Sequence, residues 1–395
     1  MATSEFIELD ITDLAYGGDG VGRTDGRACF VPFALPGERV RARLTQEATR
    51  YARADGVEVL ASSPERVAPP CPHFRACGGC RYQHLDYAAQ VRWKQKQVAE
   101  ILARIGGFRA PPLDPMIPSP HPYGYRNKIT LHGPGQPAFL ALDNRRPIPI
   151  ARCPLAAEPI NAILREQLRR TLAKGEHLVI RSNQAGEARW FTERDGRRTA
   201  SDGKPNTMTE KVLDQPYDYP LNSFFQVNPE VLKQTLIAAG GRFETFGCST
   251  LVDAYSGVGV FVLALTRRDQ RGIGIEVDAA AVAAARANAA RQAAGHVTFL
   301  QGRAEARLDR ALRDLPVDQT CLVLDPPRAG CSAPVLHAVT RRRPRRLLYL
   351  SCVPPIMARD LKQLTKSGYR LIRVQPFDMF PQTAHIECLA ELDLM

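Results

Sequence analysis

Short apolar runs alternate with helix-length stretches over the C-terminal part of the chain. The runs are rich in β-branched and other apolar residues, and each is followed by a segment long enough for a helix: LVDAYS, GIGIEVD, VTFLQG, CLVLDPP, LLYLSC, LIRVQPF and ECLAELDL. Such alternation predicts a doubly wound α/β domain with a mainly parallel sheet. We assign residues 221–395 to this Rossmann-like domain and expect its ligands beyond the carboxyl ends of the strands.

The N-terminal part has a different pattern. Between residues 6 and 61, short apolar stretches alternate with glycine-bearing turns, as in FIELDITDLAYGGDGVGR and ACFVPFALPGERVRARL. This spacing predicts a small antiparallel β-barrel. The proline-containing segment SSPERVAPPC resembles a linker, so we place the domain boundary near Ser62 and the barrel at residues 1–61.

Residues 62–220 show a mixed pattern that predicts a central α+β domain. One helix is expected over residues 87–105, whereas the passage RAPPLDPMIPSPHPYGYR holds too many prolines for a regular helix. A total of 395 residues also favours two or three domains over a single core.

The charge and the cysteine content narrow the functional classes. Lys and Arg outnumber Asp and Glu by 53 to 41, a net charge of +12, which suits an anionic partner. The N-terminal sequence MATSEFIELDITD does not resemble an export signal, and no long apolar run suggests a membrane span, so we expect a cytoplasmic protein. In a reducing compartment, the ten cysteines are expected to bind metal or do chemistry rather than form disulfides.

A tight turn after the first strand of the C-terminal domain indicates a nucleotide-type site. In DAYSGVGVF, Gly257 and Gly259 allow the backbone to approach a ligand closely, and Glu276 ends the next strand, where it can accept hydrogen bonds from ribose hydroxyls. The third glycine of a dinucleotide fingerprint is absent, which favours S-adenosylmethionine as the ligand. The competing interpretation is an ordinary strand-to-helix turn next to a solvated acid.

Three further side chains lie at strand ends of the same domain. Asp325 begins the motif DPPR, Cys352 follows the strand LLYLS, and Glu387 enters the last strand after the loop DMFPQTAH. An acid, a thiol and a second acid at one edge of a sheet could provide a base, a nucleophile and a ligand contact. Each also has a structural interpretation: a helix-capping acid, a small buried cysteine and a surface glutamate, with His385 as a competing base.

Four cysteines form a separate group. Cys71, Cys77 and Cys80 lie within ten residues, and Cys153 follows far downstream in ARCPLAAE. Four soft thiolates are typical of zinc or of an iron-sulfur cluster, and the spacing alone does not separate them. The alternative is that Cys153 is a core residue and the other three bind nothing.

Together these motifs resemble the RNA 5-methyluridine methyltransferases, most of all the 23S ribosomal RNA members with an N-terminal TRAM domain. The resemblance covers nearly the whole chain and rests on the order of YGGDGVGR, the four cysteines, YRNK, SFFQVNP, DAYSGVG, GIEVD, DPPRAG, SC at 351–352 and DMFPQTAHIE. The sequence differs from the common family pattern at Val260, Arg303 and Val353, and the first two of these differences affect the expected cofactor contacts and not the reaction.

The resemblance implies a reaction and roles for individual residues. Cys352 would add to carbon 6 of a uracil so that carbon 5 can take the methyl group of S-adenosylmethionine, and Glu387 would remove the carbon 5 proton. The remaining implied roles are contacts to the donor or the target base by Gln226, Tyr255, Glu276 and Asp325, and a [4Fe-4S] cluster on Cys71, Cys77, Cys80 and Cys153.

The implied substrate is ribosomal RNA, with transfer RNA methylated at uridine 54 as the alternative. The uridine would be flipped out of its RNA, the barrel would hold phosphate backbone, and the protein is expected to act as a monomer. Two other classes fit part of the pattern: an adenine-N6 or amide-nitrogen methyltransferase, which needs no thiol, and a noncatalytic RNA-binding factor.

Overall fold

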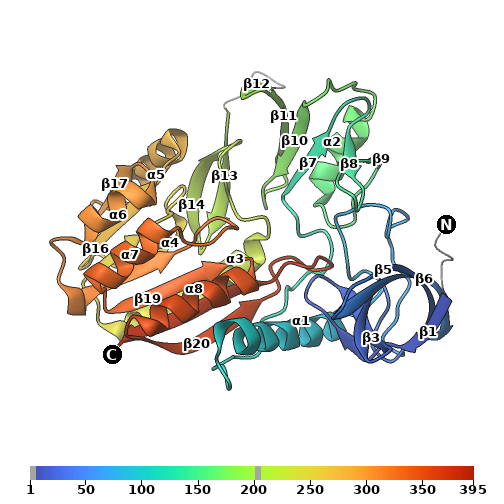
Figure 1. The fold of residues 1–395 in the computed structure, drawn as a ribbon. Coiled ribbons are helices and arrows are strands. Elements are labelled where there is room, and N and C mark those ends of the chain that lie inside the picture. The colour runs from blue at the N-terminus through green and yellow to red at the C-terminus, as the bar shows by residue number, and fades with distance from the viewer. Residues whose placement is uncertain (1–5, 201–205) are drawn as a thin grey trace.

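The computed structural model describes residues 6–200 and 206–395, which form a barrel, a central sheet with one helix, and a large α/β unit (Figure 1). The barrel strands follow the order β1-β5-β6-β4-β3-β2. Alternate residues of β1, β4 and β5 are buried, so each strand turns one face to a small apolar core. The strands are β1 Phe6–Asp10, β2 Asp13–Leu14, β3 Asp19–Thr24, β4 Arg27–Pro32, β5 Arg39–Glu47 and β6 Tyr51–Ala61.

The barrel differs from the antiparallel prediction at one strand pair. β4 and β6 run parallel, with Ala28 opposite Tyr51, while the other neighbours in this sheet are antiparallel. Parallel neighbours need a connection longer than a hairpin, and here β5 supplies it by pairing with both β1 and β6. The hydrophobic pattern of single strands contains no information on that partner choice.

The central sheet is antiparallel and has the order β12-β11-β10-β7-β8-β9. Helix α2 packs on one face through Ile160 and Leu164, which meet Leu131 and Ile180 of the sheet. The elements are β7 Lys128–His132, β8 Ala138–Leu140, β9 Pro147–Pro149, α2 Glu158–Gln167, β10 His177–Ser182, β11 Ala188–Arg194 and β12 Arg197–Ala200.

The C-terminal unit contains a seven-stranded sheet with the order β17-β16-β15-β18-β19-β21-β20. Its strands are parallel except for β21, which is antiparallel to both neighbours, so the expected doubly wound sheet is present. The strands are β15 Thr250–Asp253, β16 Arg271–Glu276, β17 Val297–Gln301, β18 Thr320–Leu324, β19 Arg346–Ser351, β20 Tyr369–Phe377 and β21 Glu387–Leu394. The helices are α3 Pro229–Phe246, α4 Val260–Leu265, α5 Ala279–Arg291, α6 Ala304–Leu312, α7 Ala333–Arg342 and α8 Pro354–Lys366, with a 3-10 turn at Val317–Gln319.

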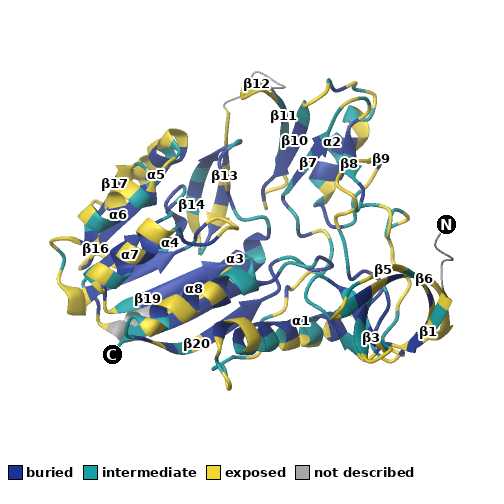
Figure 2. Ribbon diagram, in the orientation of Figure 1, coloured by how far each residue is buried: buried dark blue, intermediate teal, exposed yellow. Residues whose placement is uncertain are grey.

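Successive buried residues of this sheet face opposite layers. Leu251 and Val323 belong to the core shared with α3, α4 and α5, whereas Val252 and Leu324 belong to the core shared with α6, α7 and α8. Because both faces are covered, β15 and β18 are buried throughout. The neighbouring strand β19 is buried after its first residue and is dark in Figure 2.

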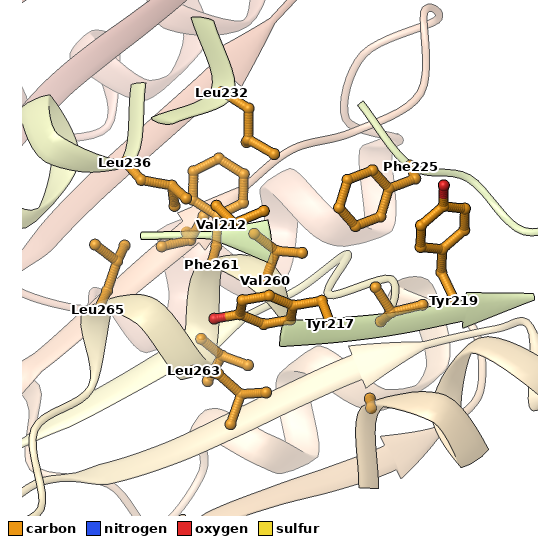
Figure 3. Packing of buried hydrophobic residues seen from close by; sticks show 14 of the residues in the cluster. Val212, Tyr217, Tyr219, Phe225, Leu232, Leu236, Val260, Phe261, Leu263 and Leu265 are labelled. Atoms are coloured by element: carbon orange, nitrogen blue, oxygen red, sulfur yellow. The ribbon is translucent and has the colours of Figure 1, made fainter. Parts of the chain in front are cut away.

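A hairpin of β13 Thr207–Val212 and β14 Gln215–Pro220 packs against the same unit. Tyr217 is buried among the side chains of α3 and α4, and Tyr219 stacks on Phe225 with ring centroids 4.5 Å apart (Figure 3). The backbone N–H of Asp218 donates to the side-chain oxygen of Asn288, on α5, at 2.8 Å, and this bond fixes the hairpin backbone. The hairpin therefore connects the central sheet to the large one as part of the larger core.

Helix α1 Tyr87–Ile101 lies between the barrel and the large sheet. Asp86 caps it by accepting from the N–H groups of Ala88 and Ala89, and a π-helical turn, Leu102–Gly106, continues it up to Gly107. The helix predicted for residues 87–105 is thus present, and its buried face packs on α8 and not on the central sheet. Among the described residues, no helix combines the length and apolar character needed to cross a bilayer.

A fully buried ion pair fastens α1 to the loop of residues 378–385. Lys94 Nζ donates to a carboxylate oxygen of Asp378 at 2.7 Å and to the carbonyl of Phe380 at 3.1 Å, and both charged side chains have 0% exposure. Burial lowers the pKa of Lys94, and the Asp378 carboxylate opposes that effect. The same loop leads directly into β21.

Replacing Lys94 by alanine is expected to destabilise the protein by about 3–5 kcal/mol, because it leaves the Asp378 carboxylate buried without its cation. Urea unfolding followed by circular dichroism measures the change. The matched control is Lys96→Ala on the same helix, where the half-exposed ion pair with Asp13 is worth about 1 kcal/mol or less. Equal losses for the two variants would contradict the role of the buried pair.

Two cysteines do not follow the expectation of free or metal-bound thiols. Cys248 and Cys321 form a disulfide that joins the residues before β15 to β18, the neighbouring strand. Parallel pairing of Thr250 with Thr320 brings the two chain segments together, although 73 residues separate the cysteines in sequence. Neither cysteine carried a pattern that pointed to the other.

Candidate active site

The turn after β15 is the place where the sequence predicts that the methyl donor binds. Gly257 and Gly259 have positive φ values of 53° and 90°, and a side chain at Gly259 would come within 3.0 Å of the Phe299 ring. Glu276, at the end of β16, accepts from the N–H of Gly257 at 3.0 Å and from that of Asp278 at 2.7 Å. Each carboxylate oxygen retains a second lone pair, so Glu276 shapes the turn and can still accept from a ligand hydroxyl.

Two aspartates lie behind this edge. Burial raises the pKa of Asp253 to about 8 even though the N–H of Tyr255 donates to it at 3.2 Å. Burial also raises the pKa of Asp325, at the end of β18, to about 7, and the two carboxyl groups repel each other. Asp325 is partly exposed where Asp253 is not, so of the two it is the one that a ligand can reach.

The three positions at which this sequence differs from the family pattern all lie at the starts of helices. Val260 opens α4 and is buried, whereas Arg303 caps α6 from an exposed position next to Glu305. Val353 caps α8, and its N–H donates to Ser351 Oγ at 3.1 Å. That bond fixes the backbone on both sides of Cys352 without an asparagine at position 353.

Strand register brings Cys352 and Glu387 together. In the antiparallel pair of β19 and β21, Ser351 is opposite Cys388, so the next residue on each strand, Cys352 and Glu387, meet at the carboxyl edge of the sheet. Burial raises the pKa of the Cys352 thiol to about 12, with a further contribution from the Glu387 carboxyl group, while Arg328 opposes both. Burial and Asp325 likewise raise the pKa of Glu387, which is 3% exposed.

The raised pKa makes Cys352 a neutral thiol in the free protein at neutral pH. Since only the thiolate reacts with iodoacetamide, the alkylation rate of the peptide with residue 352 should rise about tenfold per pH unit between about pH 7 and pH 9. Mass spectrometry of quenched samples measures this rate, with Cys352→Ala as the control for peptide assignment. A rate that levels off below about pH 8 would show a stabilised thiolate instead.

Arg328 and His385 form the outer rim of the site. A guanidinium nitrogen of Arg328 lies 3.3 Å from the ring nitrogens of His385, and burial together with that cation lowers the pKa of His385 to about 4. His385, the competing base, is therefore a neutral ring at physiological pH, and it lines the cavity described in the next paragraph.

The four cysteines of the central region line one cavity of about 470 Å³. The thiols interact electrostatically with one another, and Gln83 Nε2 donates to Cys80 Sγ at 3.1 Å. Among residues 6–200 and 206–395, no set of three or more ligating side chains converges on a point as a single metal ion requires. The structure thus places Cys71, Cys77, Cys80 and Cys153 around one cavity, while their role as ligands and the nature of any bound group stay predictions.

The same cavity contains an unusual cation. Arg181 of β10 is 2% exposed, and its Nε and Nη1 have no hydrogen-bond partner. Its guanidinium lies 5.1 Å from the centre of the Tyr219 ring, and burial lowers the pKa of Arg181. A buried unpaired cation is unstable without a neighbouring anion, which indicates that the cavity accepts negative charge.

The backbone at Gln226 is hydrogen-bonded to the central region. Asn127 of the YRNK motif donates its side-chain amide to the carbonyl of Gln226 at 3.0 Å and its N–H to that of Val227 at 3.0 Å. Two motifs that are about a hundred residues apart are therefore adjacent. Phe224, two residues before Gln226, is 66% exposed beside the cavity.

Three residues near the site had no assigned role in the sequence. Arg328 is part of the DPPR motif, and its position after the strand-end acid was the available signal. Tyr16 is part of YGGDGVGR, but nothing in the chain indicates that a barrel turn reaches the large sheet. Arg181 is in β10, where every residue after His177 is buried, and nothing in the sequence pointed to a role for it.

Comparison with known proteins gives matches for both the N-terminal and the C-terminal part of the chain. Residues 207–393 match the family model described as tRNA (Uracil-5-)-methyltransferase, and residues 4–57 match the TRAM domain. An uncharacterized RNA methyltransferase of Synechocystis is 34% identical, with 97% of this chain and 94% of the relative covered. One of Halalkalibacterium halodurans is 31% identical, with 99% and 97% covered.

The chain belongs to the RNA uracil-5-methyltransferase family. It is an S-adenosylmethionine-dependent RNA methyltransferase with an N-terminal TRAM domain, as the motif order predicted. A solved structure of the Pyrococcus abyssi tRNA (uracil-54, C5)-methyltransferase in complex with S-adenosyl-L-homocysteine is similar over 98% of this chain and 100% of that chain, at 25% identity and a TM-score of 0.71. The domain boundaries and the roles of single residues in this methyltransferase remain predictions.

Proposed function

We propose that this methyltransferase transfers the methyl group of S-adenosylmethionine to carbon 5 of a uridine in 23S ribosomal RNA through a covalent bond between Cys352 and carbon 6. The observation that carries the proposal is the register of β19 and β21, which juxtaposes a thiol and a carboxyl group beside Asp325. A uracil carbon 5 is too weak a nucleophile to attack a sulfonium methyl unaided, so it needs a group that adds to carbon 6.

The electron balance of the reaction assigns a task to each side chain. The Cys352 thiol first loses its proton to solvent, which accounts for the one proton that the overall reaction releases. The thiolate adds to carbon 6, and the electrons of the 5,6 double bond move toward the carbon 4 oxygen. Carbon 5 then takes the methyl group, and the bond between that methyl and the sulfonium sulfur breaks. Glu387 accepts the carbon 5 proton, the double bond forms again, and the bond from Cys352 to carbon 6 breaks.

The buried carboxyl groups support the proton transfers that this route needs. Cys352 must lose its proton before it adds, and Glu387 must be ionised when it takes the carbon 5 proton. Burial raises the pKa of both Asp325 and Glu387, and Asp325 adds to the rise at Glu387, which makes both groups stronger bases when ionised. We assign Glu276 and Tyr255 to the donor, and Asp325 and Gln226 to the donor or the base, by their placement around the β15 turn and the sheet edge.

We further propose that Cys71, Cys77, Cys80 and Cys153 hold a [4Fe-4S] cluster. The residues fit this group in two ways: four thiols line one cavity, and the unpaired cation of Arg181 is suited to an anionic occupant. In a four-iron cluster each thiolate binds a different iron, so the four sulfurs need not converge on one point. When bound, the cluster would act as a structural crosslink between the Cys71–Cys80 segment and Cys153.

The cluster proposal is tested by anaerobic purification. We expect a broad visible absorption that bleaches with dithionite, together with equal amounts of iron and acid-labile sulfide, and we expect both to be lost in Cys153→Ala. The matched control is Cys29→Ala, which removes a buried thiol of the barrel core. Stoichiometric zinc in place of iron would overturn the proposal.

The RNA target is tested in cells. Deletion of the gene should remove 5-methyluridine from one or more positions of 23S RNA while transfer RNA keeps its own, and re-expression of the wild-type chain should restore it. Mass spectrometry of nuclease fragments from each RNA class measures this. Loss of the modification from transfer RNA alone would favour uridine 54, the site named for the similar Pyrococcus abyssi enzyme.

A further inference from the structure

Tyr16 brings the TRAM barrel into contact with the catalytic unit. It lies on the turn between β2 and β3, and its half-buried side chain packs against the core beneath the seven-stranded sheet that also contains Cys388. Burial raises the pKa of Tyr16 to about 12, and Cys352 and Cys388 add to that rise, while Arg328 opposes it. The phenol is therefore neutral at physiological pH and shares its surroundings with the proposed nucleophile.

The turn that carries Tyr16 is held firmly in place. Gln97 of α1 donates to the carbonyls of Leu14 and Ala15, each at 3.0 Å. Gly18, with a φ of 98°, packs so closely that a side chain there would come within 3.0 Å of Arg81 Cβ. These contacts fix the turn from both sides of Tyr16.

The residues behind the turn also hold the loop that precedes Glu387. The N–H groups of Arg81 and Tyr82 both donate to the carbonyl of Gln382, at 2.8 and 3.0 Å, and the side chains of Gln90 and Gln382 bond at 2.9 Å. The position of the barrel turn is thus defined relative to residues 378–385 and, through them, to the site. A ring held in this way costs little further ordering when it meets a ligand.

We propose that Tyr16 is the residue that the TRAM barrel contributes to the catalytic pocket, where its ring stacks on the uracil that is presented to Cys352. A flipped base loses its stacking partners in the RNA and regains stacking on an aromatic side chain of the enzyme. Tyr16 is half-buried and packs against the apolar core on the α8 side of the sheet, so it is neither enclosed in that core nor free in solvent. This inference rests on the proposed function.

The experiment measures covalent adduct formation with the full-length protein. The probe is total RNA from a strain that lacks the gene and was grown with 5-fluorouracil, used at saturating concentration with S-adenosylmethionine; a fluorine at carbon 5 cannot leave as a proton and so traps the adduct. We expect Tyr16→Ala and Tyr16→Leu to lower the rate constant about 10- to 100-fold, the range for loss of one base stack. Tyr16→Phe should stay within about threefold of wild type, because it keeps the ring.

The controls separate stacking from packing. Leucine fills the apolar contact without offering an aromatic face, so a rate for Tyr16→Leu equal to that of Tyr16→Phe would overturn the inference, as would a loss in Tyr16→Phe as large as in Tyr16→Ala. Thermal unfolding midpoints and the alkylation rate of Cys352 should be the same in the three variants. Phe6→Ala, at an exposed aromatic residue of the barrel, should leave the rate unchanged.

If the wild-type protein forms no adduct, the proposed function fails, and this inference with it. A wild-type adduct that is unaffected by Tyr16→Ala refutes only the role of Tyr16.

Discussion

Cys352→Ala is expected to abolish methyl transfer, with a loss of at least about 10⁴-fold in turnover of RNA, because the variant has no group that can add to carbon 6. Cys352→Ser should be inactive as well, since a hydroxyl without an activating base is a far weaker nucleophile. Tritium transfer from S-adenosylmethionine to RNA of the deletion strain measures the loss. Donor binding, followed by calorimetry, should change by less than about threefold, because Glu276 and the β15 turn are unaltered.

The matched control for this prediction is Cys29→Ala, which removes another free thiol at a distance from the sheet edge. It should lower stability by a small amount and leave methyl transfer intact. Residual transfer by Cys352→Ala within tenfold of wild type would contradict the covalent route and would revive a direct N-methyltransferase reaction. Loss of transfer in both variants would indicate a general folding defect.

The central strands of the large sheet were predictable because they are buried on both faces. β15, β18 and β19 therefore appear in the sequence as continuous apolar runs, and every predicted run from LVDAYS to ECLAELDL overlaps an observed strand. Gly257, Gly259 and Glu276 were predictable because a tight turn and an acid at the end of the next strand depend on short stretches of sequence, which can be recognised without knowing the tertiary structure.

Pairings between distant segments were not predictable from the same patterns. The insertion of β21 between β19 and β20 is what brings Glu387 to Cys352, and no local signal specifies it, although the resemblance implied the two roles. The buried pair of Lys94 and Asp378 joins segments nearly three hundred residues apart. A lysine on a helix is usually solvated, and only the packing of α1 on the large unit makes this one a core residue.

Glu387→Gln is the second substitution with a large expected effect, and it should separate two steps that Cys352→Ala removes together. Glutamine preserves the shape of the buried side chain but cannot accept the carbon 5 proton. We expect the variant to form the covalent complex with ordinary RNA and to methylate carbon 5, but to release product about 10²- to 10⁴-fold more slowly, the range for loss of a general base. Denaturing gels should then show the variant covalently bound to RNA that contains no fluorouracil, whereas the wild type releases such RNA and shows no adduct.

The pH dependence provides an independent check on the same residue. Because burial and Asp325 raise the pKa of Glu387, its ionised form becomes more abundant as pH rises, so release by the wild type should accelerate with pH. In Glu387→Gln the slow release should lose that dependence. His385, whose pKa is lowered to about 4, is already neutral throughout the range and cannot produce such a rise. A variant that forms no adduct, or one that releases product at the wild-type rate, would show that the carbon 5 proton leaves by another group.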